Sequence, residues 1–109
     1  SSMMINTYEV KQYIDQNLKE INSIYSISSR LQVSYHTLRK SFIRTEQMSL
    51  ADYINMQKVQ AMKELLVINN RPCFSVCLEF GFREDTGAKV FKKVTGMTMK
   101  EYRKRFSVN

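Results

Sequence analysis

The sequence of 109 residues contains an internal repeat at an offset of 49 residues, and this repeat constrains the fold more than any other feature. Apolar, capping and basic positions all match without a gap. The matching pairs are Ile27 and Val76, Leu31 and Phe80, Val33 and Phe82, Phe42 and Phe91, Met48 and Met97, Ser49 and Thr98, Leu50 and Met99, Asp52 and Glu101, Tyr53 and Tyr102, Lys40 and Lys89, and Arg44 and Lys93. The repeat predicts that one supersecondary unit occurs twice.

Each copy is predicted to be a short helix, a tight turn and a second helix. In the first copy, Ile27 and Leu31 mark the short helix and residues 32–34 form the turn. The turn ends in a serine, which is a good N-cap for a second helix with Leu38 and Phe42 on its inner face. This pattern is typical of a helix-turn-helix, whose second helix enters the major groove of DNA.

The rest of the chain also shows helical spacing of apolar residues, and the expected fold class is all-α with about seven helices. The low content of turn residues, three Gly and one Pro, argues against an all-β sandwich. Asn6 followed by Glu9 resembles a capping box before a first helix near 7–19, in which Tyr8 is expected to face inward. The expected division is residues 1–6 as a linker or the start of a cut fragment, 7–53 as the first helix-turn-helix unit, 54–69 as a linker helix and 70–109 as the second unit, in one compact domain overall.

Positive charge is concentrated in two separated blocks. The formal net charge is +7, residues 28–45 hold four basic residues and no acid, and residues 86–109 hold seven basic residues and one acid. Two basic blocks suit a polyanion that is contacted twice, and double-stranded DNA is the expected partner. The alternative is a helical protein-interaction module whose basic faces meet an acidic protein, without base readout.

We predict contacts to DNA from the second helix of each copy and from the turn before it. Arg39 is the best candidate for reading guanine. The predicted base contacts are His36, Arg39, Lys40, Asp85, Thr86 and Lys89. The predicted phosphate contacts are Ser34, Tyr35, Arg44, Arg83, Lys92 and Lys93.

Other chemistry finds little support in the sequence. Cys73 and Cys77 are four residues apart, but His36 is the only histidine and no second cysteine pair completes a zinc site, so we expect two structural thiols and no metal or cofactor. Three glycines are too few for a phosphate-binding loop, and we expect no enzyme activity. A DNA-repair alkyl acceptor that uses one of the two thiols is the remaining enzyme alternative. No signal peptide or membrane span is recognisable, and a cytoplasmic location is expected.

Several motifs together resemble the DNA-binding domain of the AraC/XylS family of bacterial transcription regulators, over roughly residues 7–106. They are Ser34–Phe42 followed by Leu50, Tyr53, Val59, Leu65 and Leu66, then Phe80-Gly81-Phe82, Phe91-Lys92-Lys93-Val94-Thr95-Gly96 and Glu101-Tyr102-Arg103. The resemblance implies two helix-turn-helix units joined by a long helix, and sequence-specific binding at two adjacent major-groove segments. It also implies RNA polymerase as a partner and a missing N-terminal sensor, dimerisation or receiver domain.

The second copy departs from the family pattern between residues 83 and 90. The family usually has one more residue between Phe82 and Phe91, and here Gly87 occupies the position that matches Leu38. A glycine in a helix interior costs about 1 kcal/mol relative to alanine. We therefore expect a short or poorly held second recognition helix, and we expect the first unit to supply most of the base discrimination. Gln47 stands where the family usually has Gly, and we therefore expect a looser end to the helix that carries Leu38 and Phe42.

Overall fold

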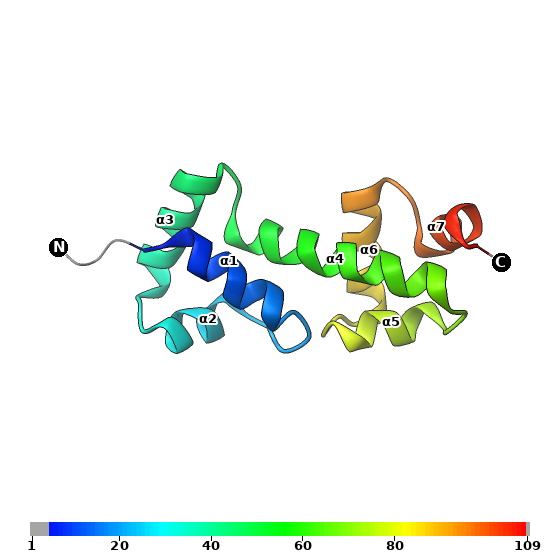
Figure 1. The fold of residues 1–109 in the computed structure, drawn as a ribbon, viewed down its shortest axis with the longest axis horizontal. Helices are drawn as coiled ribbons and strands as arrows, with labels where there is room; N and C mark the ends of the chain where they lie inside the picture. The colour runs from blue at the N-terminus through cyan, green and yellow to red at the C-terminus, as the bar shows by residue number, and fades with distance from the viewer. Residues whose placement is uncertain (1–4, 109) are drawn as a thin grey trace. The chain divides into compact units, whose positions relative to one another are not determined.

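The computed structural model describes residues 5–108, and within this range it contains seven α-helices and no strand, which confirms the all-α expectation. The helices are α1 (Thr7–Gln16), α2 (Ile24–Leu31), α3 (Tyr35–Glu46), α4 (Leu50–Ile68), α5 (Cys73–Glu79), α6 (Glu84–Thr95) and α7 (Met99–Phe106), as shown in Figure 1. The chain divides into two compact units between Ile54 and Asn55, inside α4. Of the expected leading segment 1–6, residues 1–4 lie outside the described range. None of the described helices is both long and apolar enough to cross a membrane.

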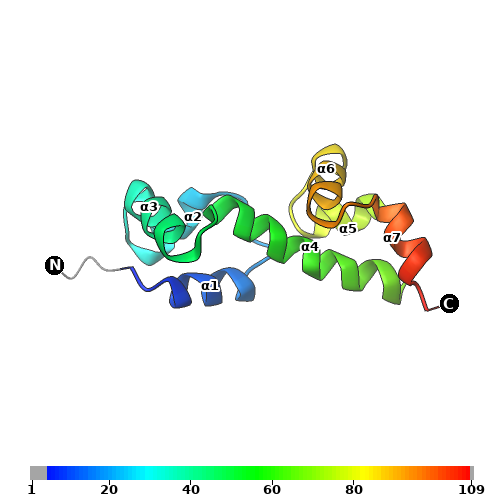
Figure 2. The ribbon, with the colours of Figure 1, turned by 90° about the horizontal axis from the view of Figure 1, so that it is seen from above.

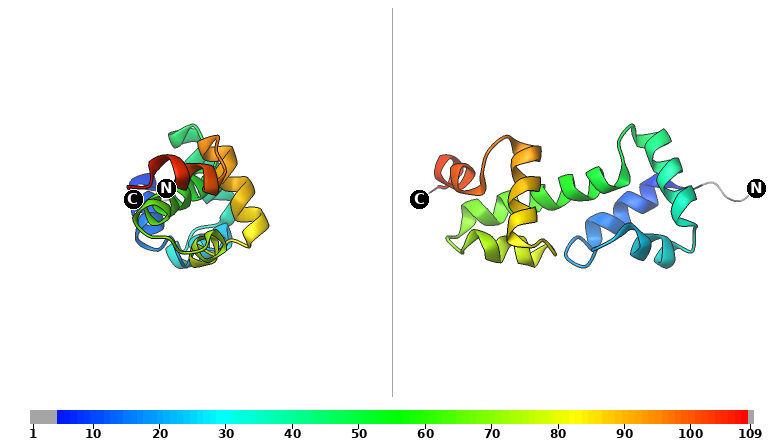
Figure 3. Two further views of the ribbon diagram at one scale, coloured as in Figure 1. Left: turned by 90° about the vertical axis from the view of Figure 1, so that its right-hand side faces the viewer. Right: turned by 180° about the vertical axis from the view of Figure 1, so that it is seen from behind.

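The structure reproduces the 49-residue repeat helix by helix. The helices α5 and α6 begin 49 residues after α2 and α3, and α7 begins 49 residues after α4. In each unit the paired helices pack together at a steep angle, as Figures 1 and 3 show for α2 with α3 and for α5 with α6. The two copies of the helix-turn-helix are therefore confirmed.

Left-handed backbone conformations also recur at the repeat spacing. Gln32 has a φ of 58° after α2, and Gly81 has a φ of 80° after α5. Gln47 has a φ of 62° after α3, and Gly96 has a φ of 82° after α6. Glutamine in this conformation strains the backbone, since its Cβ approaches the following carbonyl, whereas glycine has no Cβ. Gln47 nevertheless closes α3 through its N–H, which donates to Ile43 O at 3.0 Å.

Side chains cap the helix starts that the sequence indicated. Asn6, Ser34 and Thr98 cap α1, α3 and α7, and in each case the side-chain oxygen accepts a hydrogen bond from a first-turn N–H. Thr98 also forms a reciprocal capping box with Glu101. Arg83 precedes α6 and makes no such side-chain bond. A cap of this kind contributes about 1 kcal/mol, so α3 starts from a better-defined end than α6.

The core of the first unit lies between α1, α2, α3 and the first turns of α4, and Figure 2 shows α1 below α3, with which it is in contact. Its buried apolar residues are Val10, Ile14, Ile21, Ile27, Leu38, Phe42, Leu50, Tyr53 and Ile54. The rings of Phe42 and Tyr53 lie 5.5 Å apart. The second unit repeats this pairing, with the rings of Phe91 and Tyr102 5.6 Å apart. The repeat therefore extends to the contacts of the core.

The first helix differs from the expectation in its end and in one of its faces. It ends at Gln16 and not near residue 19, because Asn17 donates its side-chain N–H to Tyr13 O at 2.8 Å and caps the helix. Tyr8 was expected to face inward, but its side chain is 65% exposed. Thr7 is the buried residue of the first turn in its place.

The second recognition helix is neither short nor loosely packed, which corrects the expectation drawn from Gly87. The helix α6 has 12 residues, as does α3, and Gly87 is buried in it. A Cβ added at Gly87 would lie 2.6 Å from Cys77 Sγ and 3.1 Å from Phe82 Cβ. The neighbouring side chains thus occupy the space that Leu38 fills in the first unit. The register of α6 follows the repeat without a shift.

Two cations hold the connections of the second unit. Lys58 is 4% exposed, and its Nζ donates to Phe80 O at 2.7 Å, at the turn that precedes α6. Burial lowers the pKa of this lysine. Arg103 of α7 donates from Nε to Leu66 O at 2.9 Å and from Nη2 to Arg71 O at 2.6 Å. These bonds satisfy backbone carbonyls near the ends of α4 and α5 and in the connection between them.

Candidate nucleic-acid interface

The outer side of α3 is a basic surface without a carboxylate. The inner side of the helix consists of Leu38, Ser41 and Phe42, which are buried. The exposed side chains are His36, Thr37, Arg39, Lys40, Ile43, Arg44 and Thr45. Three of them are cations: Lys40 and Arg44 are four residues apart, which places them on neighbouring turns of one side, and Arg39 is adjacent to Lys40. This side of α3 attracts a polyanion.

The start of α3 is an ordered helix N-terminus next to this surface. Ser34 Oγ accepts a hydrogen bond from Thr37 N at 3.0 Å, and the Ser34 hydroxyl donates to Thr37 Oγ1 at 2.7 Å. The serine proton is therefore used within the cap. The other first-turn N–H groups of a helix point along its axis and favour an anion such as phosphate.

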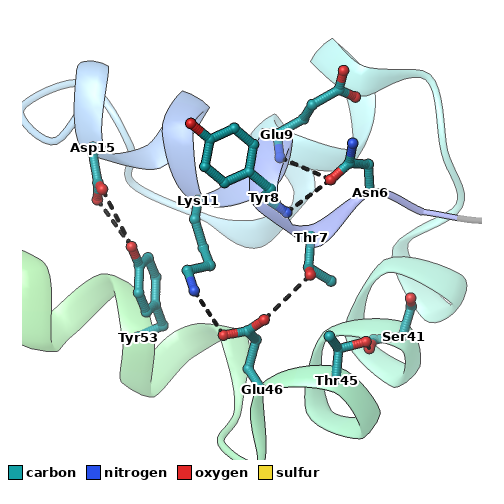
Figure 4. A network of polar contacts seen from close by, with 10 residues as sticks. All are labelled: Asn6, Thr7, Tyr8, Glu9, Lys11, Asp15, Ser41, Thr45, Glu46 and Tyr53. Carbon is teal, nitrogen blue, oxygen red and sulfur yellow. Dashed lines mark hydrogen bonds and ion pairs between the residues drawn. The ribbon is translucent and has the colours of Figure 1, made fainter.

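The one acid of α3 is directed away from the basic surface. Glu46 accepts hydrogen bonds from Lys11 Nζ at 2.8 Å and from Thr7 Oγ1 at 3.2 Å, both from α1 (Figure 4). The bond from Lys11 holds the pKa of Glu46 below its usual value. In the same network the hydroxyl of Tyr53 donates to the Asp15 carboxylate at 3.2 Å, and burial raises the pKa of Tyr53 to about 12. These contacts tie α1 to the end of α3 and to the start of α4.

A pair of tyrosines lies at the beginning of α3. Tyr35, one of the predicted phosphate contacts, is half-buried, because its ring stacks on the ring of Tyr25 from α2. The ring centroids are 4.1 Å apart and the planes differ by 10°. The guanidinium carbon of Arg39, one turn further along α3, lies 5.5 Å from the centroid of Tyr35.

The outer side of α6 carries both signs of charge. Its exposed side chains are Glu84, Asp85, Thr86, Ala88, Lys89, Lys92, Lys93 and Val94. By the repeat, Asp85, Lys89 and Lys93 correspond to His36, Lys40 and Arg44, and Ala88 corresponds to Arg39. The second unit therefore lacks the arginine that the first unit presents at this place.

The start of α6 is acidic. Glu84 and Asp85 lie in its first turn, where carboxylates favour the helix dipole but repel phosphate. Asp85 accepts a hydrogen bond from Thr86 N at 2.8 Å and pairs with Arg83 at 3.5 Å. These two neighbours lower the pKa of Asp85, the hydrogen bond more than the arginine. The exposed Arg83 is thus partly neutralised by its own helix.

The predicted site residues fall into two groups in the structure. His36, Arg39 and Lys40 share the outer side of α3, and the predicted residues of the second copy lie at the first turns and the outer side of α6. Sequence reasoning did not single out Tyr25, whose partner on α3 is ten residues further along the chain. Tyr35 and Arg39 are four residues apart on one helix, and this spacing is a local signal that could have predicted the contact between them.

The thiols are placed as packing residues. Cys77 is buried with its Sγ 3.7 Å from Met99 Sδ, and burial raises its pKa to about 11. Cys73 is half-buried on the preceding turn. Within residues 5–108, no group of three or more His, Cys, Asp or Glu side chains could hold a metal ion.

Comparisons with known proteins identify the fold and the family. A family model described as a helix-turn-helix domain matches residues 27–105. The chain is similar to the C-terminal domain of AraT, a response regulator from Geobacillus stearothermophilus, with a TM-score of 0.90, 19% identity and coverage of 100% of this chain and 92% of that chain. It is similar to a probable AraC family transcriptional regulator from Rhodopseudomonas palustris, with a TM-score of 0.80, 19% identity and coverage of 98% and 99%.

The DNA-binding domain of the global transcriptional factor AdpA, solved in complex with a target DNA, is a further similar structure. It has a TM-score of 0.82, 19% identity and coverage of 91% of this chain and 90% of that chain. No curated protein sequence is similar enough to count as a relative. The family and the fold are those of DNA-binding transcription regulators and not those of enzymes. With two copies of the motif and a match over residues 27–105, the chain belongs to the helix-turn-helix domain family of the AraC type.

Proposed function

We propose that this chain binds double-stranded DNA sequence-specifically, as the output domain of a transcription regulator. The observation that carries the proposal is the outer side of α3, which presents Arg39, Lys40 and Arg44 to solvent while its one acid is paired with α1. The AdpA domain, which has the same fold, was solved with its target DNA. In this proposal α3 and α6 enter two major-groove segments on one side of the duplex, about 34 Å apart.

The two kinds of contact have different tasks. Cations and helix N-termini bind phosphates and release counterions, which gives affinity without sequence information. In the first unit we assign this task to Arg44, to the capped helix start at Ser34 and to the main-chain N–H of Tyr35 in the first turn of α3. In the second unit we assign it to Arg83, Lys92 and Lys93.

Base discrimination requires side chains that reach base edges in the groove. Arginine pairs with guanine through two parallel hydrogen bonds, which suits Arg39 at the second turn of α3. His36 and Lys40 flank it on the same side of the helix. In the second unit the corresponding candidates are Asp85, Thr86 and Lys89. The carboxylate of Asp85 repels phosphates and limits which base edges can lie next to this helix. We therefore assign most of the discrimination to α3.

The proposal includes further partners. RNA polymerase is the machinery that a DNA-bound regulator would influence, and an additional domain that senses a ligand, dimerises or receives a phosphoryl group would control the output. Pull-down of RNA polymerase by the DNA-bound domain tests the proposed contact with the polymerase. If no polymerase is retained, the proposed function is limited to DNA binding.

Selection of duplexes from a random library, followed by sequencing, tests the central proposal. We expect enrichment of one motif with two half-sites about one helical turn apart. For the selected duplex, log affinity against log salt concentration should fall with a slope of roughly −5 if about six phosphates are neutralised. A scrambled duplex of equal length is the control. If no duplex binds, the protein-interaction alternative is favoured, and a slope near zero would contradict the role of the basic surface.

A further inference from the structure

Two tyrosines and an arginine form a connected group on the surface of the first unit. The rings of Tyr25 and Tyr35 are nearly parallel, with centroids 4.1 Å apart, and the Arg39 guanidinium lies over Tyr35 at 5.5 Å from its centroid. Tyr25 remains 64% exposed although its ring is stacked. The group is therefore held together at the surface by its own ring contacts.

The helix-turn-helix geometry brings these three side chains together. Tyr35 and Arg39 are four residues apart on α3, a spacing that places them one above the other. The turn between α2 and α3 returns the chain so that the first turn of α2, with Tyr25, faces the first turn of α3. The group lies at the N-terminal part of the recognition helix, which is the part that contacts base edges in this motif.

Stacking on Tyr35 restricts a side chain that would otherwise be mobile. A free arginine samples many rotamers, and immobilising such a side chain on binding reduces affinity. A guanidinium over an aromatic ring is attracted by the negative face of the ring and tends to a defined plane. Bidentate pairing with guanine requires a defined plane of this kind.

We propose that Tyr25 and Tyr35 form a platform that positions Arg39 for base readout, so that they determine specificity without reading a base themselves. This inference rests on the proposed function and deepens it. The repeat supplies an internal contrast, because Phe74, Glu84 and Ala88 stand at the three corresponding positions of the second unit. The platform is thus a property of the first unit, where the discrimination is assigned.

Substitutions at Tyr35 test the platform on the selected duplex and on duplexes altered at each base position. We expect Tyr35→Leu to weaken binding of the selected duplex about twofold to fivefold, the range of an exposed cation–π contact. Discrimination should fall at one base position, the same one that Arg39→Ala affects. Tyr35→Phe keeps the ring and should retain both affinity and discrimination. Glu84→Leu, at the corresponding place on α6, is the matched control and should leave that position unchanged.

A double-mutant cycle separates positioning from a direct contact. In the Arg39→Ala background, Tyr35→Leu should have no further effect at that base position. Equal effects of Tyr35→Leu in both backgrounds would overturn the proposal. A loss with Tyr35→Phe as large as with Tyr35→Leu would also overturn it, because it would assign the effect to the tyrosine hydroxyl on a phosphate.

A measurement on the free protein keeps the inference testable apart from DNA. Relaxation of the Arg39 side-chain Nε–H by NMR should show an ordered guanidinium in the wild-type chain. Tyr35→Leu should make it more mobile and Tyr25→Leu should do so to a smaller extent, with unchanged thermal unfolding. Unchanged Arg39 mobility in both variants would overturn the platform. If the wild-type chain binds no duplex, the proposed function fails by itself, before any variant is compared.

Discussion

Replacing Gly87 by alanine tests whether this glycine is a weakness of α6 or a requirement of its packing. In an exposed helix interior, Gly→Ala stabilises by about 1 kcal/mol because alanine restricts the unfolded chain and shields the backbone. Gly87 is buried, and the added methyl group would lie 2.6 Å from Cys77 Sγ and 3.0 Å from Cys77 Cβ. The first of these distances is shorter than any normal van der Waals contact.

The magnitude follows from the two opposing contributions. Forcing one extra carbon into a well-packed core costs about 1–3 kcal/mol, which exceeds the propensity gain. We therefore expect Gly87→Ala to lower the free energy of unfolding by about 1 kcal/mol, measured by urea denaturation with far-UV circular dichroism. Ala88→Gly, at the next and exposed position, is the matched control and should cost about 1 kcal/mol through propensity alone.

Cys77 identifies the contact responsible. Removing its Sγ in Cys77→Ala opens the space that the new methyl group needs, so the double variant should be more stable than the sum of the single effects predicts, by about 1 kcal/mol. The rescue should be partial, since Phe82 Cβ still lies 3.1 Å from the added carbon. If Gly87→Ala instead stabilises the chain as an exposed site would, the close packing of α5 against α6 is refuted.

Three further predictions concern binding, pH and the helix ends. Arg39→Ala should cost about 1–3 kcal/mol of binding free energy on the preferred duplex and relax one base position, whereas Lys89→Ala should cost less and act uniformly; titrations on matched and scrambled duplexes check this, and the reverse ranking would contradict the assignment. Because its pKa is lowered from 4.5, Glu46 stabilises the fold above that pH, and this contribution is lost as pH falls through the lowered pKa, so Glu46→Gln should lose less stability than wild type in acid unfolding. Gln47→Gly should stabilise the chain by roughly 1 kcal/mol and Gly96→Gln should destabilise it by a similar amount, since both positions have positive φ; thermal unfolding with no change in either variant would argue against the strain.

Much of the fold is determined by local sequence. The caps at Ser34 and Thr98, the inner pair Leu38 and Phe42, and the glycine at position 96 each specify a helix start, face or end through short-range interactions. Because these signals recur at one offset, the repeat also indicates that two units share one architecture. The outward position of the basic residues of α3 follows from the same periodicity.

Contacts between distant segments were decided only by the tertiary structure. The partner of Glu46 is Lys11, 35 residues away, and no local pattern connects them. The stack of Tyr25 on Tyr35 depends on how the turn between two helices sets their angle. Gly87 is another position that local sequence does not explain. Helix propensity predicts that a glycine here lowers stability, but the close packing around it requires a residue without a Cβ. Propensity describes one segment in solvent, whereas the space at a buried position is set by side chains that the rest of the chain brings to it.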